Sequence, residues 1–179
     1  MLKNFLESAK KLKDTRVLCS CAILIALYVV LYSVKIPLAA DLRITFTFIP
    51  LALCGWLFGC VPAILVGIIS DILSSIFFPM GAYFPGFTLT SALTGFIFGL
   101  FLYKQEKILT GVIFSKIIVN IILNTVLNAL WLTMLYSKGY IFYLSSHFLK
   151  NIVSLGVDVI VLVMIIKILT RYNIKKMYK

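Results

Sequence analysis

The sequence predicts an all-α membrane protein, a six-transmembrane-helix bundle with both termini in the cytoplasm. Of its 179 residues, 62% are hydrophobic and only 13% are charged, whereas soluble domains have roughly 45–50% apolar and about 25% charged residues. A spanning helix needs about 20 mainly apolar residues. A chain of this length therefore has room for about six spans and for no soluble domain.

The apolar runs and the breaks between them define each element in order. Residues 1–16 are basic, with apolar residues at helical spacing, which predicts an amphipathic helix on the membrane surface. The spans are expected at 17–34, 44–59, 62–78, 88–103, 108–136 and 146–170. The segment 79–87, rich in helix breakers and aromatic residues, predicts an ordered loop over a cavity. The chain thus divides into a basic segment (1–16), a transmembrane domain (17–170) and a basic tail (171–179).

The basic residues predict the orientation. The net charge is +11, but no RNA-binding motif accompanies it, so membrane topology explains the charge better than nucleic acid does. With six spans, both termini share one side with the loop at 104–107. By the positive-inside rule this side is the cytoplasm, because it holds 12 of the 17 lysine and arginine residues: Lys3, Lys10, Lys11, Lys13, Arg16, Lys104, Lys107, Lys167, Arg171, Lys175, Lys176 and Lys179.

Several functions are excluded by missing motifs. No GxxxxGK[ST] phosphate loop is present, so the chain is not expected to hydrolyse ATP itself. No set of nucleophile, base and orienting residue indicates an enzyme. The four cysteines lack CxxC spacing, so neither a metal site nor a redox motif is predicted. We expect no catalytic residues, no metal and no cofactor.

Three ionisable residues fall inside the predicted spans, namely Asp71, Lys116 and Asp158. Such residues cost several kcal/mol each in a membrane and are candidate functional residues by default. One interpretation is an internal ion pair of Lys116 with Asp71 or Asp158 that holds helices together. The other is contact with a substrate or a role in coupling.

Two polar stripes run along the last two spans. At about 100° per residue, a spacing of four drifts only about 40° per step and keeps side chains on one face. The first stripe comprises Lys116, Asn120, Asn124 and Asn128; the second comprises His147, Lys150, Asn151, Ser154 and Asp158. Facing stripes would enclose a polar cavity open to the outside. The alternatives are hydrogen bonding between helices and, for His147, a helix-start residue with no ligand role.

Cations and aromatic residues are predicted at the outer mouth of this cavity. The cations are Arg43, Lys138 and Lys150, and the aromatic residues are Phe46, Phe48, Tyr83, Phe84, Phe87, Trp131 and Tyr136. This combination suits a flat anionic ring compound, through stacking and charge-assisted hydrogen bonds. Interfacial aromatic belts are the alternative. Two small-residue pairs, Ala22 with Ala26 and Gly95 with Gly99, allow close helix packing within the chain or with a partner.

Nearly the whole chain resembles the substrate-binding (S) subunits of energy-coupling factor (ECF) transporters, and among them the folate-specific group. The resemblance rests on Ala22-xxx-Ala26, the stretch from Arg43 to Pro50, Ser70-Asp71-Ile-Leu, the stretch from Gly81 to Thr90, Lys116 with Asn120 and Asn124, and Leu149-Lys150-Asn151. His147 departs from the arginine that is frequent at its position in the family.

The resemblance implies a bacterial cell-membrane subunit that binds folate with high affinity under the loops after the first and third spans. A transmembrane coupling subunit would pack on Ala22 and Ala26, and two cytoplasmic ATPases would supply the energy. The same machinery with another flat vitamin, such as riboflavin or thiamine, is the alternative; a non-transport membrane scaffold is the other.

The implied folate site assigns a role to most of the polar and aromatic candidates. Arg43 and Lys150 would meet carboxylates, and Asp71 would accept from a pterin amino group. The stacking walls would be Tyr83, Phe84, Phe87 and Trp131, and the polar readers Asn120, Asn124 and Asn151. The predicted site also includes Phe46, Thr88, Lys116 and His147.

Overall fold

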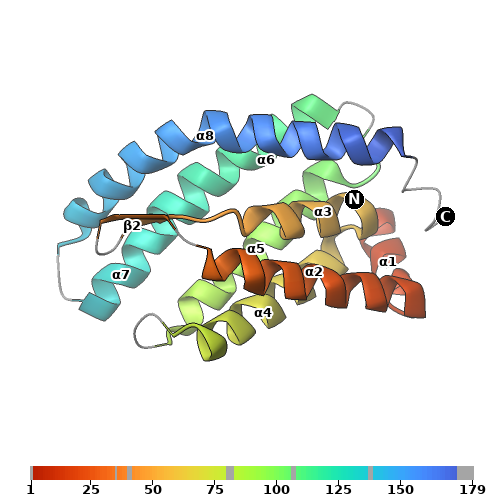
Figure 1. Ribbon diagram of the computed structural model, residues 1–179, viewed down its shortest axis with the longest axis horizontal. Helices are drawn as coiled ribbons and strands as arrows, with labels where there is room; N and C mark the ends of the chain where they lie inside the picture. The colour runs from red at the N-terminus through yellow and green to blue at the C-terminus, as the bar shows by residue number, and fades with distance from the viewer. Residues whose placement is uncertain are drawn as a thin grey trace.

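The computed structural model in Figure 1 is all-helical apart from one short hairpin. It describes residues 2–34, 36–39, 42–79, 83–105, 108–136 and 139–172. Within these ranges, five helical runs are long and apolar enough to cross a membrane: Thr15–Ser33, Cys60–Phe77, Pro85–Leu102, Ile108–Tyr136 and Tyr140–Arg171. The predicted second span is instead the short apolar helix α3, Phe48–Phe58. The predicted all-helical fold is thus confirmed, with five candidate spans among the described residues where the sequence predicted six.

Two helices form the N-terminal part. Helix α1 (Leu2–Lys11) covers most of the predicted amphipathic segment, and α2 (Thr15–Ser33) is the first span. Asp14 separates them as an N-cap, because its carboxylate accepts a hydrogen bond from the Arg16 backbone N–H at 2.9 Å. Such a cap satisfies one of the backbone donors that a helix start leaves unpaired.

A β-hairpin precedes α3 where the sequence predicted a loop and the start of a helix. Strands β1 (Ile36–Ala39) and β2 (Leu42–Ile44) are antiparallel, with Pro37 opposite Arg43. Helix α3 begins only at Phe48, which corrects the predicted start at residue 44. The alternation of β-branched and aromatic residues after Arg43 favours extended backbone, and Pro50 then falls in the first turn of α3, where it is tolerated.

Helices α4 (Cys60–Phe77) and α5 (Pro85–Leu102) pack against each other through glycine. A Cβ atom on Gly95 would lie 2.2 Å from the Ala63 carbonyl oxygen, and one on Gly99 would lie 2.4 Å from the Cys60 Cα atom. The GxxxG pair therefore serves packing inside this chain. Gly59, between α3 and α4, has a φ of 92°, a conformation that glycine adopts at little cost.

The predicted span at 108–136 is one continuous helical run with a wide turn in its centre. Helix α6 (Ile108–Ile118) is followed by the π-helix η1 (Val119–Leu127) and by α7 (Asn128–Tyr136). The Thr125 hydroxyl donates to the Asn120 carbonyl, five residues earlier, at 2.8 Å. The last helix, α8 (Tyr140–Arg171), begins six residues before the predicted start at 146.

The apolar core fills the half of the bundle in which α3 ends and α4 begins. Its largest buried side chains include Trp56, Phe58, Phe98, Leu102 and Leu162. The other half of the bundle, on the far side of Phe48 from this core, carries the polar side chains that line the cavity. The fold thus supports a polar site on a close-packed base.

Candidate functional site

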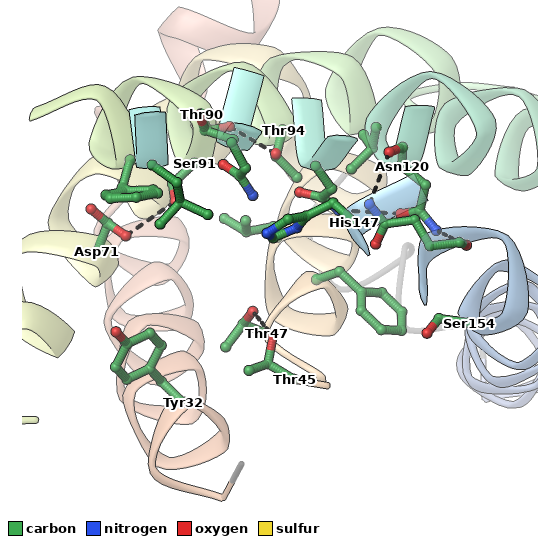
Figure 2. A pocket seen from close by; sticks show the side chains of 18 of the residues that line it. Tyr32, Thr45, Thr47, Asp71, Thr90, Ser91, Thr94, Asn120, His147 and Ser154 are labelled. Atoms are coloured by element: carbon green, nitrogen blue, oxygen red, sulfur yellow. Dashed lines mark hydrogen bonds between the residues drawn. The ribbon is translucent and has the colours of Figure 1, made fainter. Parts of the chain in front are cut away.

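A cavity of about 360 Å³ lies among α2, α3, α4, α5, the run from α6 to α7, and α8. Figure 2 shows polar side chains from these elements directed into a common space. The volume is at the lower end of the range typical of small-molecule sites. Ten of the predicted site residues line it: Asp71, Tyr83, Phe84, Phe87, Lys116, Asn120, Asn124, His147, Lys150 and Asn151.

Lys116 and Asp158 form an ion pair on the cavity wall. The Lys116 Nζ atom lies 2.8 Å from the Asp158 carboxylate, and the side chains are 1% and 11% exposed. The same Nζ atom lies 3.5 Å from the centre of the Phe48 ring, close enough for a cation–π interaction. Of the two partners that the sequence left open, Lys116 therefore takes Asp158, and the contact joins α3, α6 and α8.

Asp71 has a different environment, on the wall formed by α4 and α5. Its carboxylate accepts hydrogen bonds from Thr88 at 2.8 Å and from Ser91 at 3.3 Å. The Tyr83 hydroxyl lies 2.8 Å from the Thr88 hydroxyl. Because Thr88 has one hydroxyl proton and gives it to Asp71, Tyr83 donates to Thr88. Thr88 does not line the cavity; it orients the carboxylate that does.

The asparagines divide into two groups. Asn120 and Asn151 bond to each other's backbone, with amide nitrogens 3.5 and 3.4 Å from the opposite carbonyl oxygens, and Asn151 also donates to Thr125 at 2.8 Å. Asn124 donates to the Asn120 side chain at 3.2 Å. The side-chain oxygen of Asn128, which also lines the cavity, has no hydrogen-bond partner among the described residues. Asn120 and Asn151 thus tie η1 to α8, whereas the Asn128 oxygen is buried beside the cavity without a hydrogen bond among the described residues.

An aromatic wall closes another side of the cavity. The Phe84 ring contacts Trp131 at a centroid distance of 5.6 Å and Phe87 at 6.2 Å. Trp131 does not line the cavity; its ring N–H donates to Thr90 at 3.0 Å, which fixes it behind Phe84. Phe46 also lies outside the cavity, packed against Phe48 and the core.

Of the remaining predicted residues, the structure describes two with their side chains and one by its backbone alone. His147 is buried and points into the cavity in Figure 2, and Lys150 lines it as well. Only the backbone of Arg43 is described, in strand β2, so its side chain lies outside the described part of the structure. Lys138 lies outside the described residues altogether.

A third polar stripe was missed in the sequence. Thr90, Ser91 and Thr94 on α5 line the cavity, as do Thr47 and Tyr32. The first three recur at helical spacing and could have been recognised by the same argument as the asparagines. Hydroxyl groups are less conspicuous than charges because they also occur in helix packing, where they bond to the backbone of their own helix, as Thr94 does with Thr90 at 2.8 Å.

Fold and site together define a class of protein: a helical membrane protein with a polar and aromatic cavity of small-molecule size. Aromatic rings, amides, hydroxyls and two lysine ammonium groups line this one cavity. The chain matches the family of substrate-specific components of ECF transporters over residues 16–166, and it belongs to that family. The family consists of substrate-binding transport subunits and not of enzymes.

Individual relatives agree with this assignment. The chain is 32% identical to the folate transporter FolT of Clostridium novyi, over 84% of this chain and 88% of that protein. It is 26% identical to FolT of Leuconostoc mesenteroides, over 82% of each.

Two solved structures are similar as well. A crystal structure of FolT bound with folic acid has a TM-score of 0.78 and 31% identity, covering 85% of this chain and 93% of that one. A bacterial ECF transporter S component has a TM-score of 0.69 and 26% identity, covering 88% and 97%.

Proposed function

We propose that this chain is the high-affinity folate-binding subunit of an ECF-type vitamin importer. The observation that carries the proposal is the polar and aromatic cavity in a chain whose fold matches FolT bound with folic acid over most of both chains. Lys150 and His147 offer donors to the carboxylates of a folate, and Phe84 and Phe87 offer faces to its rings. Asp71, oriented by Thr88 and Ser91, can accept from a pterin amino group.

Tryptophan fluorescence tests the proposal, because the chain has only two tryptophans and they differ in location. Trp131 stands behind Phe84 at the cavity wall, and Trp56 is buried in the core. We expect saturable quenching of purified protein at micromolar folic acid or below. Trp56→Phe should keep most of the quenching, and Trp131→Phe should lose most of it.

The competing substrates are tested in the same titration. Riboflavin and thiamine are expected to leave the folate response unchanged when added first in tenfold excess. Displacement by either would assign the site to that vitamin. Absence of quenching by all three in well-folded protein would contradict vitamin binding and favour a non-transport scaffold.

The proposal extends to membrane placement and partners. We infer six crossings of the bacterial cell membrane, with α3 as the short second crossing and both termini in the cytoplasm. The excess of basic residues at that side supports this orientation. A transmembrane coupling subunit and two ATPase subunits would complete the importer, with ATP used by the ATPases alone. Labelling of an introduced terminal cysteine from outside intact cells would contradict the orientation.

A further inference from the structure

Helix α1 lies at the end of the bundle away from the hairpin and α7 (Figure 1). Its side chains contact the junction where α3 ends and α4 begins, and the residues that follow α5. Because α4 and α5 are candidate spans, their ends mark the boundary of the hydrocarbon layer. Helix α1 is therefore held at the level of a membrane surface.

Three polar contacts fix α1 on this junction. The fully buried Ser8 hydroxyl donates to the Phe58 carbonyl at 2.9 Å and accepts from the Val61 N–H at 3.1 Å. The Lys11 ammonium donates to the Leu57 carbonyl at 3.2 Å. These bonds satisfy backbone groups that the break between α3 and α4 leaves without helical partners.

An ion pair between Glu7 and Lys104 adds to the attachment. The Lys104 ammonium lowers the pKa of the Glu7 carboxyl below its ordinary value, and Glu7 raises the pKa of Lys104. Both groups are thus charged at neutral pH. Helix α1 cannot turn about its axis without breaking these contacts, so its outward residues are fixed.

The outward side of α1, the turn after it and the start of α2 together present apolar and basic residues. Phe5 and Leu6 are 43% and 57% exposed, and Lys10, Lys13 and Arg16 are exposed as well. At about 100° per residue, Leu6 and Lys10 stand about 40° apart on the helix. Apolar side chains beside cations on a helix lying flat at a membrane surface suit the boundary between acyl chains and anionic headgroups.

We propose that α1, the turn that follows it and the start of α2 form a binding surface for anionic phospholipids. Phe5 and Leu6 enter the acyl boundary, and Lys10, Lys13 and Arg16 contact headgroup phosphates. The proposal is independent of the transported substrate. A soluble acidic partner is disfavoured by the two large apolar side chains, which a lipid surface covers directly.

Hydrogen exchange of the α1 amides in the full-length protein tests the proposal. The protein is placed in nanodiscs of pure phosphatidylcholine or of phosphatidylcholine with 30% phosphatidylglycerol. We expect exchange at least about tenfold slower in the anionic discs, because each basic residue near such a surface adds severalfold to its affinity. The triple variant K10Q/K13Q/R16Q should lose this difference.

Two controls make the result decisive. The variant K167Q/R171Q removes exposed cations from the end of α8 and should keep the lipid dependence. Raising the salt concentration with the unaltered protein should abolish it, which requires no variant to fold. Equal exchange in both kinds of disc, or a lipid dependence that survives in the triple variant, would overturn the proposal.

Discussion

Lys116 carries a charge inside a membrane-spanning helix and has a structural role there, because it joins neighbouring helices. Its ammonium is almost fully buried, and its compensation comes from one carboxylate and one aromatic ring. Taking a charge out of water costs several kcal/mol, and only good geometry with a partner repays that cost. The pair therefore holds α3, α6 and α8 in register beside the cavity.

Removing one member of this pair should be much worse than removing both. We expect Lys116→Met to destabilise the protein by about 3–5 kcal/mol, because it leaves Asp158 buried without a cation. The double variant Lys116→Met with Asp158→Leu should recover much of that loss. Unfolding in detergent with increasing denaturant measures both, and a double variant that adds the two single losses would contradict the ion-pair role.

Asn128 and Asn151 should respond differently to truncation. Asn128→Ala removes an oxygen without a partner among the described residues, so we expect folate binding to weaken by about tenfold with little change in stability. Asn151→Ala breaks the bonds to Asn120 and Thr125 and should lower stability by about 1–2 kcal/mol. Isothermal titration and thermal unfolding separate the two effects. A loss of stability in Asn128→Ala would make it a packing residue.

At the scale of elements, the contact between α4 and α5 depends on the absence of side chains. Gly95→Ala would force its new methyl group against the Ala63 carbonyl oxygen, and overpacking of this kind costs about 1–3 kcal/mol. Gly156 on α8 has open space where a Cβ would lie, so Gly156→Ala should be neutral or slightly stabilising. Thermal unfolding of the two variants in the same detergent checks this. Equal melting temperatures would show that α4 and α5 can separate without cost.

Helical spans were predictable from the sequence because apolar length and breakers are local signals. The hairpin before α3 was not, since strands as short as Leu42–Ile44 form only when neighbouring elements hold them. The π-helix was also missed. A spacing of four residues, as between Asn120 and Asn124, is compatible with both an α-helix and a π-helix, so the sequence pattern does not distinguish them.

At the scale of the whole molecule, the site too was predictable only as far as it depends on local sequence signals. The stripes of asparagine and lysine predicted a common cavity because helical spacing places residues on one face. Which carboxylate would meet Lys116 depended on which helices are neighbours, and spacing within one helix does not contain that information. Trp131 and Phe46 were misplaced for the same reason, because one stands behind Phe84 and the other against the core.

The exposed face of α2 offers a test of assembly. Ala22 and Ala26 are exposed in the isolated chain, as a docking face for a coupling subunit requires. We expect Ala22→Trp to abolish co-purification with such a subunit and to leave folate binding unchanged. Ile160→Trp, at a position on α8 that is 61% exposed, is the matched control and should assemble normally. Normal assembly of Ala22→Trp would exclude α2 as the docking face.

The π-helix finally explains how one span can serve two purposes. In an unbroken α-helix the stripe would rotate by about 120° between Lys116 and Asn128, since each step of four residues overshoots a turn by about 40°. In η1 a turn contains more than four residues, so a step of four residues falls short of a full turn. The stripe therefore rotates in the opposite direction in η1, which offsets its rotation in the α-helical parts. The π-helical segment therefore lets the two halves of the span be oriented separately. Lys116 on α6 pairs with Asp158, and Asn128 at the start of α7 still lines the cavity.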